Sequence, residues 1–216
     1  MTTASRELER SLASDWGIVA GMDEVGRGAL AGPVAVGVAL IGVHAGPVPE
    51  GLTDSKALTP RRRDALVEPI QSWVQDCAVG YASPQEIDRW GIIVALRLAG
   101  RRALAEVASR GLVPGGVLLD GSHDWLSEPD DLFGGIDEPE DPFGVELPVH
   151  MQVKADLSCA VVAAASVLAK VARDRLMTDA DDPGYGWASN KGYGSAAHAR
   201  AIAELGVCDF HRRSWK

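Results

Sequence analysis

Two short apolar runs, residues 18–23 and 34–41, flank a glycine-rich turn and constrain the fold of this 216-residue chain more than any other feature. Short apolar runs separated by glycine and proline are typical of neighbouring strands. The first run ends in two consecutive acids, Asp23 and Glu24. Because neighbouring residues of a strand point to opposite faces, both carboxylates can reach one site only if the strand ends there. The turn that begins at Val25 predicts such an ending.

Strands and helices alternate along the rest of the chain. Further apolar runs predict strands at residues 77–82, 117–120 and 149–154. Periodicity, capping serines and a proline at a first helical position predict helices at about residues 60–74, 92–109, 157–177 and 195–205. This order indicates an α/β sheet of mixed direction. We expect one domain over residues 17–216, preceded by an N-terminal tail at 1–16 that is either a short helix or a loose segment.

Charge is unevenly distributed in the chain, whose formal net charge is −9 from 21 Lys and Arg against 30 Asp and Glu. Residues 121–150 hold nine of these acids and no Lys or Arg, so the rest of the chain is neutral. The same segment has four prolines, four glycines and no periodicity, which predicts a surface loop, an acidic insertion at about residues 121–148. Because local clusters decide nucleic-acid binding, the net charge does not exclude a nucleic-acid partner.

The cysteines and the apolar segments indicate the compartment. Cys77, Cys159 and Cys208 are odd in number and form no C-x-x-C pair, which excludes a disulfide scaffold and a cysteine zinc site. The N-terminus has no apolar signal core, and the most apolar stretch, residues 160–169, is shorter than the roughly 20 residues of a membrane span. We expect a cytoplasmic monomer without membrane attachment.

Carboxylates recur where the predicted strands end. Asp120 ends the run 117–120, and Asp156 lies between a predicted strand and a predicted helix. Open α/β sheets bind ligands at this edge, and clustered carboxylates without cysteine suit Mg²⁺ or Mn²⁺. Two such ions about 3.5–4 Å apart can activate a water and stabilise the leaving oxygen of a phosphodiester. A single strand-end aspartate is more often a cap or turn residue, so the repetition carries the metal hypothesis.

The turn Gly26-Arg27-Gly28 places bare backbone and one cation beside the acid pair. Glycine permits close approach of a sugar–phosphate backbone, and its N–H groups can bind phosphate or ribose oxygens. On turn chemistry alone, a hairpin whose glycines supply positive φ angles is the more common explanation. The sequence contains neither a Walker A loop nor the dinucleotide fingerprint.

The motifs together resemble the ribonuclease HII family, the type 2 ribonucleases H. The similarity begins at residues 21–33 and continues in family order through Asp54-Ser55-Lys56, Leu119-Asp120-Gly121, Lys154-Ala155-Asp156, and residues 163–174, 191–194 and 211–214. It covers about residues 17–216. The chain departs from the family pattern at Ala155, where glycine is usual.

The resemblance implies a fold and an activity. The fold would be ribonuclease H-like, an α/β five-stranded mixed sheet flanked by helices with a helical C-terminal portion. The activity would be endonucleolytic hydrolysis of RNA in RNA–DNA hybrids, and cutting 5′ of ribonucleotides embedded in duplex DNA. The cuts would leave 3′-hydroxyl and 5′-phosphate ends by metal-assisted attack of water, with Mg²⁺ or Mn²⁺ as cofactor. Ribonucleotide excision repair is the corresponding process.

The resemblance also implies roles for individual residues. The metal-binding and catalytic carboxylates would be Asp23, Glu24, Asp120 and Asp156. Gly26, Arg27 and Gly28 would contact the 2′-hydroxyl at the RNA–DNA junction, and Tyr193 would pack against the neighbouring deoxyribose. Polar and basic residues expected to contact the substrate backbone or organise the site are Ser55, Lys56, Lys170, Lys191 and Arg212. The acidic segment is expected to point away from the phosphates, which it would repel.

Two alternatives differ from this hypothesis. Ribonuclease HIII shares the acid pair but usually carries an extra N-terminal domain, for which the roughly 17 residues before the first strand leave no room. The Gly-Arg-Gly triplet also favours HII. A non-catalytic binder of hybrid nucleic acid is the second alternative. Clustered acids would contribute nothing to such a surface, and metal-dependent turnover would distinguish the two.

Overall fold

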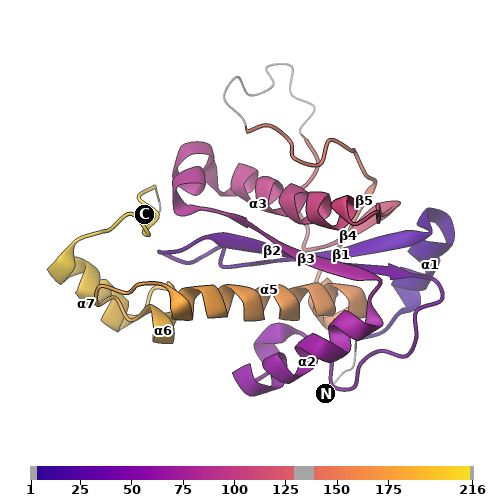
Figure 1. Cartoon of the computed structure of the whole chain (residues 1–216), viewed down its shortest axis with the longest axis horizontal. Coiled ribbons are helices and arrows are strands. Elements are labelled where there is room, and N and C mark those ends of the chain that lie inside the picture. The colour runs from indigo at the N-terminus through magenta and orange to yellow at the C-terminus, as the bar shows by residue number, and fades with distance from the viewer. Residues whose placement is uncertain (1–3, 129–138, 215–216) are drawn as a thin grey trace.

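A mixed five-stranded sheet forms the centre of the computed structural model, which describes residues 4–128 and 139–214 (Figure 1). The strands are β1 (Ile18–Val25), β2 (Val34–Gly42), β3 (Asp76–Ala82), β4 (Gly116–Asp120) and β5 (Val149–Gln152). Their order across the sheet is β3-β2-β1-β4-β5. The pairs β1–β2 and β2–β3 are antiparallel, whereas β1–β4 and β4–β5 are parallel. The predicted mixed sheet is therefore confirmed.

The helices begin mostly at the predicted caps. They are α1 (Glu7–Trp16), α2 (Pro60–Trp73), α3 (Pro84–Ser109), α4 (Ala155–Ser158), α5 (Ala160–Asp179), α6 (Trp187–Asn190) and α7 (Ala196–Leu205). A 3₁₀ turn, η1, covers Ser55–Ala57. The side chains of Thr59, Ser83 and Ser195 cap α2, α3 and α7. The single helix predicted over 157–177 is wrong. Cys159 has an extended backbone and forms an isolated β-bridge with Ser5, and this interruption separates α4 from α5.

The helices cover both faces of the sheet. In Figure 1, α3 lies on one face, while α5 and α2 lie on the other. Two glycines let α5 approach the sheet closely, because a Cβ on Gly37 would lie 2.2 Å from the Ala165 carbonyl oxygen and one on Gly21 would meet the Val161 backbone. The close contact brings the polar residues of α5 against the carboxyl end of β1. Beyond α5, α6 and α7 form the expected helical C-terminal portion.

The N-terminal segment is a helix, the first of the two expected alternatives, and it belongs to the folded domain. The Ser5 N–H donates to the Ser158 carbonyl over 2.8 Å, and the Ala160 N–H donates to the Ser5 carbonyl over 3.0 Å. The buried Glu9 carboxylate accepts a hydrogen bond from the Val161 N–H at 2.7 Å. Cys159, the N-cap of α5, makes no side-chain capping bond, so Glu9 of α1 supplies one across the fold.

The described parts of the acidic segment are irregular loop, as predicted, but they are anchored to α3. Trp125 and Leu126 are buried among the core residues on the α3 face of the sheet. Arg101 of α3 is also buried, and its guanidinium donates to Asp141 at 3.1 Å and to Glu146 at 2.6 Å. Apolar anchors and one arginine therefore fix both ends of the segment. Residues 129–138 of the predicted insertion lie outside the described residues.

Across residues 4–128 and 139–214, the helices are too short or too polar for any of them to cross a bilayer.

Candidate active site

Asp23 and Asp120 lie at neighbouring positions on two parallel strands. Met22 of β1 is in register with Leu119 of β4, so the next residues, Asp23 and Asp120, follow side by side at the carboxyl end of the sheet. Asp23 is 3% exposed, and Asp120 is half-buried. The structure thus brings together the two carboxylates that the ends of apolar runs predicted.

Glu24 lies within β1 and not at its end. The antiparallel pairing of β1 and β2 continues through Glu24 opposite Val36 and Val25 opposite Ala35, so the strand extends beyond the predicted ending. The turn itself begins at Gly26 and not at Val25. Glu24 remains close enough to Asp120 for their charges to interact. Its carboxylate also pairs with the Arg27 guanidinium at 3.5 Å.

The four predicted carboxylates share one electrostatic environment. The pKa of Asp23 is raised to about 7, mainly by burial; a hydrogen bond from Ser166 lowers it, and the charges of Glu24, Asp120 and Asp156 add to the increase. Burial is also the main reason that the pKa values of Glu24 and Asp156 are raised, and Asp120 adds to both shifts. Mutual repulsion among buried carboxylates favours binding of a cation.

Asp156 reaches this environment through a left-handed residue. Lys154 has φ 59°, and Ala155 then begins α4. The buried Ala155 donates its N–H to the Asp120 carboxylate at 2.7 Å. Among the described non-glycine residues, only Lys154 and Lys191 have a positive φ. The φ of Ala155 is therefore negative, so alanine fits at this position without backbone strain. The departure from the family's glycine therefore leaves Asp156, which is buried, beside Asp120.

Each carboxylate has its own partner in the protein. Asp23 accepts from the Glu24 N–H at 2.8 Å, and Asp156 pairs with the Lys56 ammonium at 3.5 Å. Partial burial works to lower the pKa of Lys56, but the charges of Asp156 and Asp23 outweigh it and raise that pKa. The Lys56 side chain is 74% exposed, so it is a solvent-facing counter-charge at the rim of the site.

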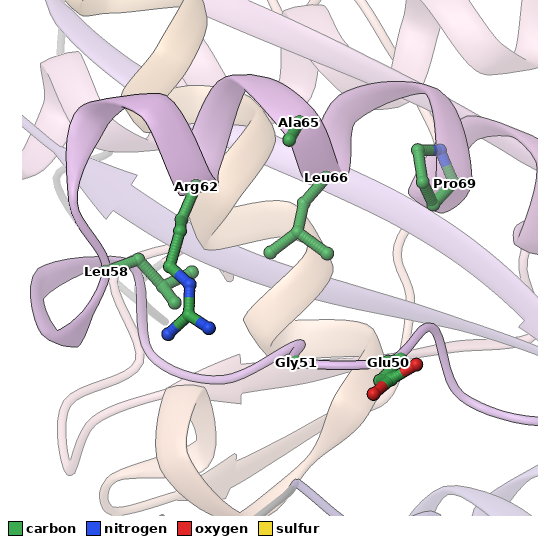
Figure 2. A pocket seen from close by; sticks show the side chains of 7 residues that line it. All are labelled: Glu50, Gly51, Leu58, Arg62, Ala65, Leu66 and Pro69. Atoms are coloured by element: carbon green, nitrogen blue, oxygen red, sulfur yellow. The ribbon is translucent and has the colours of Figure 1, made fainter.

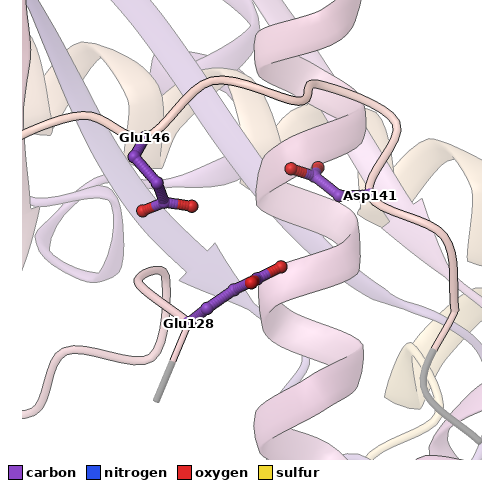
Figure 3. Close-up of side chains that lie close together, drawn as sticks. All are labelled: Glu128, Asp141 and Glu146. Atoms are coloured by element: carbon purple, nitrogen blue, oxygen red, sulfur yellow. The ribbon is translucent and has the colours of Figure 1, made fainter. Parts of the chain in front are cut away.

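A second group of acids lies elsewhere, beside α3. The oxygens of Glu128, Asp141 and Glu146 lie within 4.8 Å of one another, and Figure 3 shows the three side chains turned toward each other. Two of them, Asp141 and Glu146, bind the buried Arg101 guanidinium. This group is explained as the counter-charge of Arg101. We therefore assign no metal to it.

Gly26 and Gly28 differ in why they are glycine. Gly26 has φ 86°, and a Cβ there would lie 2.1 Å from Nε of Arg173. A Cβ on Gly28 would meet nothing within 4 Å. The hairpin explanation of the turn therefore holds for Gly26, which needs both a positive φ and the space. Gly28 faces open space next to the carboxylates.

Two buried arginines hold the turn from behind. Arg173 is 0% exposed and donates to the carbonyls of Pro33 at 2.8 Å, Lys191 at 3.0 Å and Ala31 at 3.2 Å. Arg212, also buried, donates to the carbonyl of Gly32 at 3.0 Å and to that of Arg27 at 2.9 Å. Burial, and then the charge of Arg173, lower the pKa of Arg212 to about 9. The Arg27 carbonyl, within the turn, and the carbonyls of residues 31–33, which follow it, are thus drawn inward.

The inward carbonyl of Arg27 fixes the direction of the Gly28 N–H. In a trans peptide, the N–H of Gly28 points opposite to the carbonyl of Arg27. That carbonyl faces the buried Arg212, so the Gly28 N–H faces away from the interior. Within the described residues, the N–H groups of Arg27 and Gly28 donate to no protein acceptor, and both residues are exposed. The turn therefore presents free donors at the edge of the carboxylate site.

Tyr193 lies next to this turn. The carbonyl of its neighbour Gly192 accepts hydrogen bonds from the N–H groups of Leu30 at 2.8 Å and Ala31 at 3.1 Å. The Tyr193 ring is half-buried, with the Lys170 ammonium 5.5 Å and the Arg173 guanidinium 5.3 Å from its centre. These cations restrict the orientation of the ring.

The remaining predicted contact residues have different surroundings. Ser55 is buried, and its hydroxyl oxygen lies 2.9 Å from that of Ser166, which links η1 to the residue that hydrogen bonds Asp23. Lys170 pairs with Asp174 at 2.7 Å. The Lys191 ammonium donates to the Thr178 hydroxyl and the Ala188 carbonyl. Lys56 and Ser55 therefore lie with the carboxylates, Lys170 lies with Tyr193, and Lys191 is bound within the C-terminal portion.

A cavity of about 390 Å³ lies apart from these residues, between α2 and the preceding loop (Figure 2). Its apolar wall comes from α2 and from Leu58, and Arg62 and Glu50 lie at its rim. It includes none of the predicted site residues. The candidate site is instead the carboxyl edge of the sheet, where the four carboxylates lie close enough to interact.

Sequence reasoning did not identify the structural roles of Arg173, His198 and His211. Arg173 is fully buried. One signal was available, because Arg173 follows Ser166 by seven residues, or two helical turns, and thus shares its sheet-facing side of α5. The two histidines contact each other only through the tertiary fold, so no local pattern indicated them.

Comparisons with known proteins point to one family. The sequence model of the family described as Ribonuclease HII matches residues 20–216. A ribonuclease HII of Streptomyces avermitilis is 45% identical over 212 residues, covering 96% of this chain and 82% of that protein. The ribonuclease HII of Paracoccus denitrificans is also 45% identical, covering 96% and 89%. Among solved structures, a PCNA:RNase HII complex from Archaeoglobus fulgidus matches with TM-score 0.63 and 28% identity over 92% of this chain and 95% of that one. The fold is accordingly ribonuclease H-like.

Proposed function

The chain belongs to the ribonuclease HII family, and from that premise we propose that it is a divalent-metal-dependent endonuclease. It hydrolyses RNA in RNA–DNA hybrids and cuts 5′ of single ribonucleotides in duplex DNA, leaving 3′-hydroxyl and 5′-phosphate ends. We further propose that it acts as a cytoplasmic monomer in the removal of ribonucleotides from DNA.

One observation carries the proposal. The buried Asp23 and its neighbour Asp120 each follow the last register pair of β1 and β4, at the carboxyl end of the sheet, next to a turn whose free Gly28 N–H faces outward. Carboxylates for metal binding and donors for a ribose hydroxyl thus share one edge. A surface that only bound phosphates would be weakened by buried acids, so this combination favours catalysis over binding alone.

The donor set fits Mg²⁺ or Mn²⁺. Asp23, Glu24, Asp120 and Asp156 offer only oxygen ligands, and their mutual repulsion would be relieved by divalent charge. Ions bound there would supply activation of water and stabilisation of the charge that develops on the phosphate. The protein's own contribution is to hold the carboxylates in place, through the Ala155 N–H on Asp120 and the Ser55–Ser166 pair behind Asp23.

The Gly26–Gly28 turn supplies recognition of RNA. The 2′-hydroxyl is the group that distinguishes RNA from DNA at a given position. The outward N–H of Gly28 can donate to that hydroxyl without side-chain obstruction, because Gly28 has open space in front of it. Arg27, paired with Glu24, joins this turn to the carboxylates, so recognition and chemistry are adjacent.

The other predicted residues support these two functions. The half-buried Tyr193 ring offers an aromatic surface to a sugar without a 2′-hydroxyl. The exposed Lys56 and the half-buried Lys170 and Lys191 contact phosphates on either side, the latter two after exchanging their internal partners. The guanidinium of Arg212 is buried, so this residue supports the site by holding the carbonyls of Arg27 and Gly32 in place.

The test is cleavage of end-labelled substrates with Mg²⁺ or Mn²⁺. A duplex with one ribonucleotide, a long RNA–DNA hybrid, an all-DNA duplex and an EDTA reaction form the panel. We expect metal-dependent cutting of the first two and no cutting of all-DNA. Cleavage of the hybrid alone would refute the junction role of the turn. Binding of the hybrid without any cleavage would support the non-catalytic alternative instead.

A further inference from the structure

Two histidines lie in contact inside the C-terminal portion, away from the carboxylates. His198 of α7 is 0% exposed, and His211 of the C-terminal segment is 3% exposed. Their Nε2 atoms are 3.1 Å apart. Buried polar groups are costly unless every donor meets an acceptor, so a pair of this kind is retained where its geometry matters.

The contacts at the two ends of the pair determine where its protons lie. The Cys208 N–H donates to Nδ1 of His211 at 3.1 Å, so that nitrogen carries no proton. In neutral His211 the proton is then on Nε2, which donates to Nε2 of His198. The proton of His198 is consequently on Nδ1, which lies 3.0 Å from the Tyr193 carbonyl, a group that can only accept. The chain of hydrogen bonds is complete when both rings are neutral.

His198 restrains the segment that carries Tyr193. The Tyr193 carbonyl accepts from His198 and also from the Ser195 N–H at 2.9 Å. The Tyr193 N–H donates to the Asn190 carbonyl at 2.9 Å. Both peptide groups of Tyr193 are therefore held in place, which fixes the position from which its ring projects toward Lys170 and Arg173.

His211 restrains the segment that follows the glycine turn. It forms an isolated antiparallel bridge with Ala31. The flanking residues form two more hydrogen bonds. The Gly32 N–H donates to the Phe210 carbonyl at 2.8 Å, and the Arg212 N–H donates to the Leu30 carbonyl at 2.9 Å. The contact between the two histidines thus joins the Tyr193 segment to residues 30–32, next to Gly26-Arg27-Gly28.

The surroundings keep this connection dry and rigid. The Tyr185 ring packs edge-on against His211 with centres 4.6 Å apart, and Trp187 stacks on Tyr185 at 5.4 Å. A second connection runs parallel to it through the Gly192 carbonyl, which accepts from Leu30 and Ala31. Two separate links between the same segments fix their spacing and also their relative orientation.

We propose that the His198–His211 pair is a positioning device that sets the Tyr193 ring against the Gly26-Arg27-Gly28 turn, and thereby determines how well the site recognises an RNA–DNA junction. This inference rests on the proposed function. Neither histidine touches substrate, since both are buried, so they are positioning residues and not catalytic ones. Their removal changes substrate recognition more than the rate of the chemical step.

Two amide variants of His198 separate positioning from stability. The amide nitrogen of asparagine lies near the place of Nδ1, so His198→Asn keeps a donor to the Tyr193 carbonyl and leaves the His211 Nε2–H unpaired. The amide of glutamine lies near Nε2, so His198→Gln keeps contact with His211 and loses the donor to Tyr193. The asparagine variant should have the lower Tm, because it buries an unpaired donor. The glutamine variant should have the higher KM.

The experiment measures KM, kcat and Tm with a duplex that contains one ribonucleotide, in the presence of Mg²⁺. We expect His198→Gln to raise KM roughly tenfold with kcat changed less than about threefold, and His198→Asn to stay within about threefold of wild type in KM. In a Tyr193→Ala background the KM effect of His198→Gln should disappear while its Tm shift remains. Tyr185→Phe is the control, since it removes a hydroxyl bonded to the Gly206 carbonyl in the same cluster and leaves the histidines intact.

Three results would overturn the inference: additive KM effects of His198→Gln and Tyr193→Ala, KM values that follow Tm across the two amide variants, or a rise in KM for Tyr185→Phe as large as that for His198→Gln. A wild-type protein that cleaves no RNA-containing duplex would refute the proposed function itself, and this inference with it. Because the other three results require an active wild type, the two failures are distinguishable.

Discussion

Gly26 and Arg173 lie so close that no side chain fits between them: a Cβ on Gly26 would be 2.1 Å from Nε of Arg173. The guanidinium cannot move aside freely, since it donates to three backbone carbonyls. The glycine that begins the turn and the arginine of α5 are therefore one structural unit. The shape of the turn at the sheet edge depends on both.

Substitution of Gly26 should mainly reduce stability, whereas substitution of Gly28 should mainly reduce cleavage. Gly26→Ala combines a positive φ with a steric clash, so we expect it to lower the free energy of unfolding by about 3 kcal/mol. Gly28→Ala has open space, so its stability should stay within about 0.5 kcal/mol of wild type. Its methyl group would nevertheless obstruct the outward N–H and reduce cleavage of a duplex with one ribonucleotide. Urea unfolding and cleavage rates measure both effects, and equal stability losses would contradict this description of the turn.

Glu9 should make stability depend on pH between about 4.5 and 7. Burial raises the pKa of this carboxyl from 4.5 to about 7 in the folded state. The folded protein then binds the proton more tightly than the unfolded chain, so the free energy of unfolding falls as pH rises through this window, by up to about 3 kcal/mol. Glu9→Gln removes that contribution and keeps an acceptor for the Val161 N–H.

The raised pKa of Asp23 gives the same pH dependence of stability in both proteins. The difference in unfolding free energy between wild type and Glu9→Gln therefore isolates the contribution of Glu9. Chemical denaturation at several pH values in EDTA gives the two slopes. Parallel curves would show that Glu9 does not carry the dependence.

The histidine pair predicts one tautomer for each ring. Burial, and then the charge of His198, lower the pKa of His211 below its usual 6.5, so the ring is neutral at pH 8. Long-range ¹H–¹⁵N NMR spectra should show His198 protonated at Nδ1 and His211 at Nε2. Observation of the reverse tautomers, or of a charged His211 at that pH, would contradict the hydrogen-bond chain. Cys208→Ala, which keeps the backbone donor to His211, is the control and should leave both tautomers unchanged.

The sequence was sufficient to predict the sheet and the carboxylates, for local reasons. Asp23 and Asp120 each follow an apolar run, and a buried strand of that kind delivers its end residue to the edge of a sheet. Caps at Ser83 and Ser195 likewise depend on residues only three positions apart. Motif resemblance added the family and the roles, which periodicity does not contain.

The sequence was not sufficient for features that depend on distant contacts. Arg173 and Arg212 look like surface cations, and their burial follows from carbonyls of residues 27–33 that only the tertiary fold brings near. The end of β1 beyond Asp23 is set by its pairing with β2. The break before α5 follows from the bridge between Ser5 and Cys159. In each case the deciding partner is remote in sequence.

The most direct test of the central claim is to map the cut in a 5′-labelled duplex with one ribonucleotide, using wild type and Asp23→Asn in parallel. The account predicts that wild type with Mg²⁺ or Mn²⁺ cuts on the 5′ side of the ribonucleotide, and that EDTA stops it. Asp23→Asn should lose at least about 100-fold in rate while its binding of the duplex changes little. Near-normal cleavage by Asp23→Asn, or cutting at positions unrelated to the ribonucleotide, would contradict it.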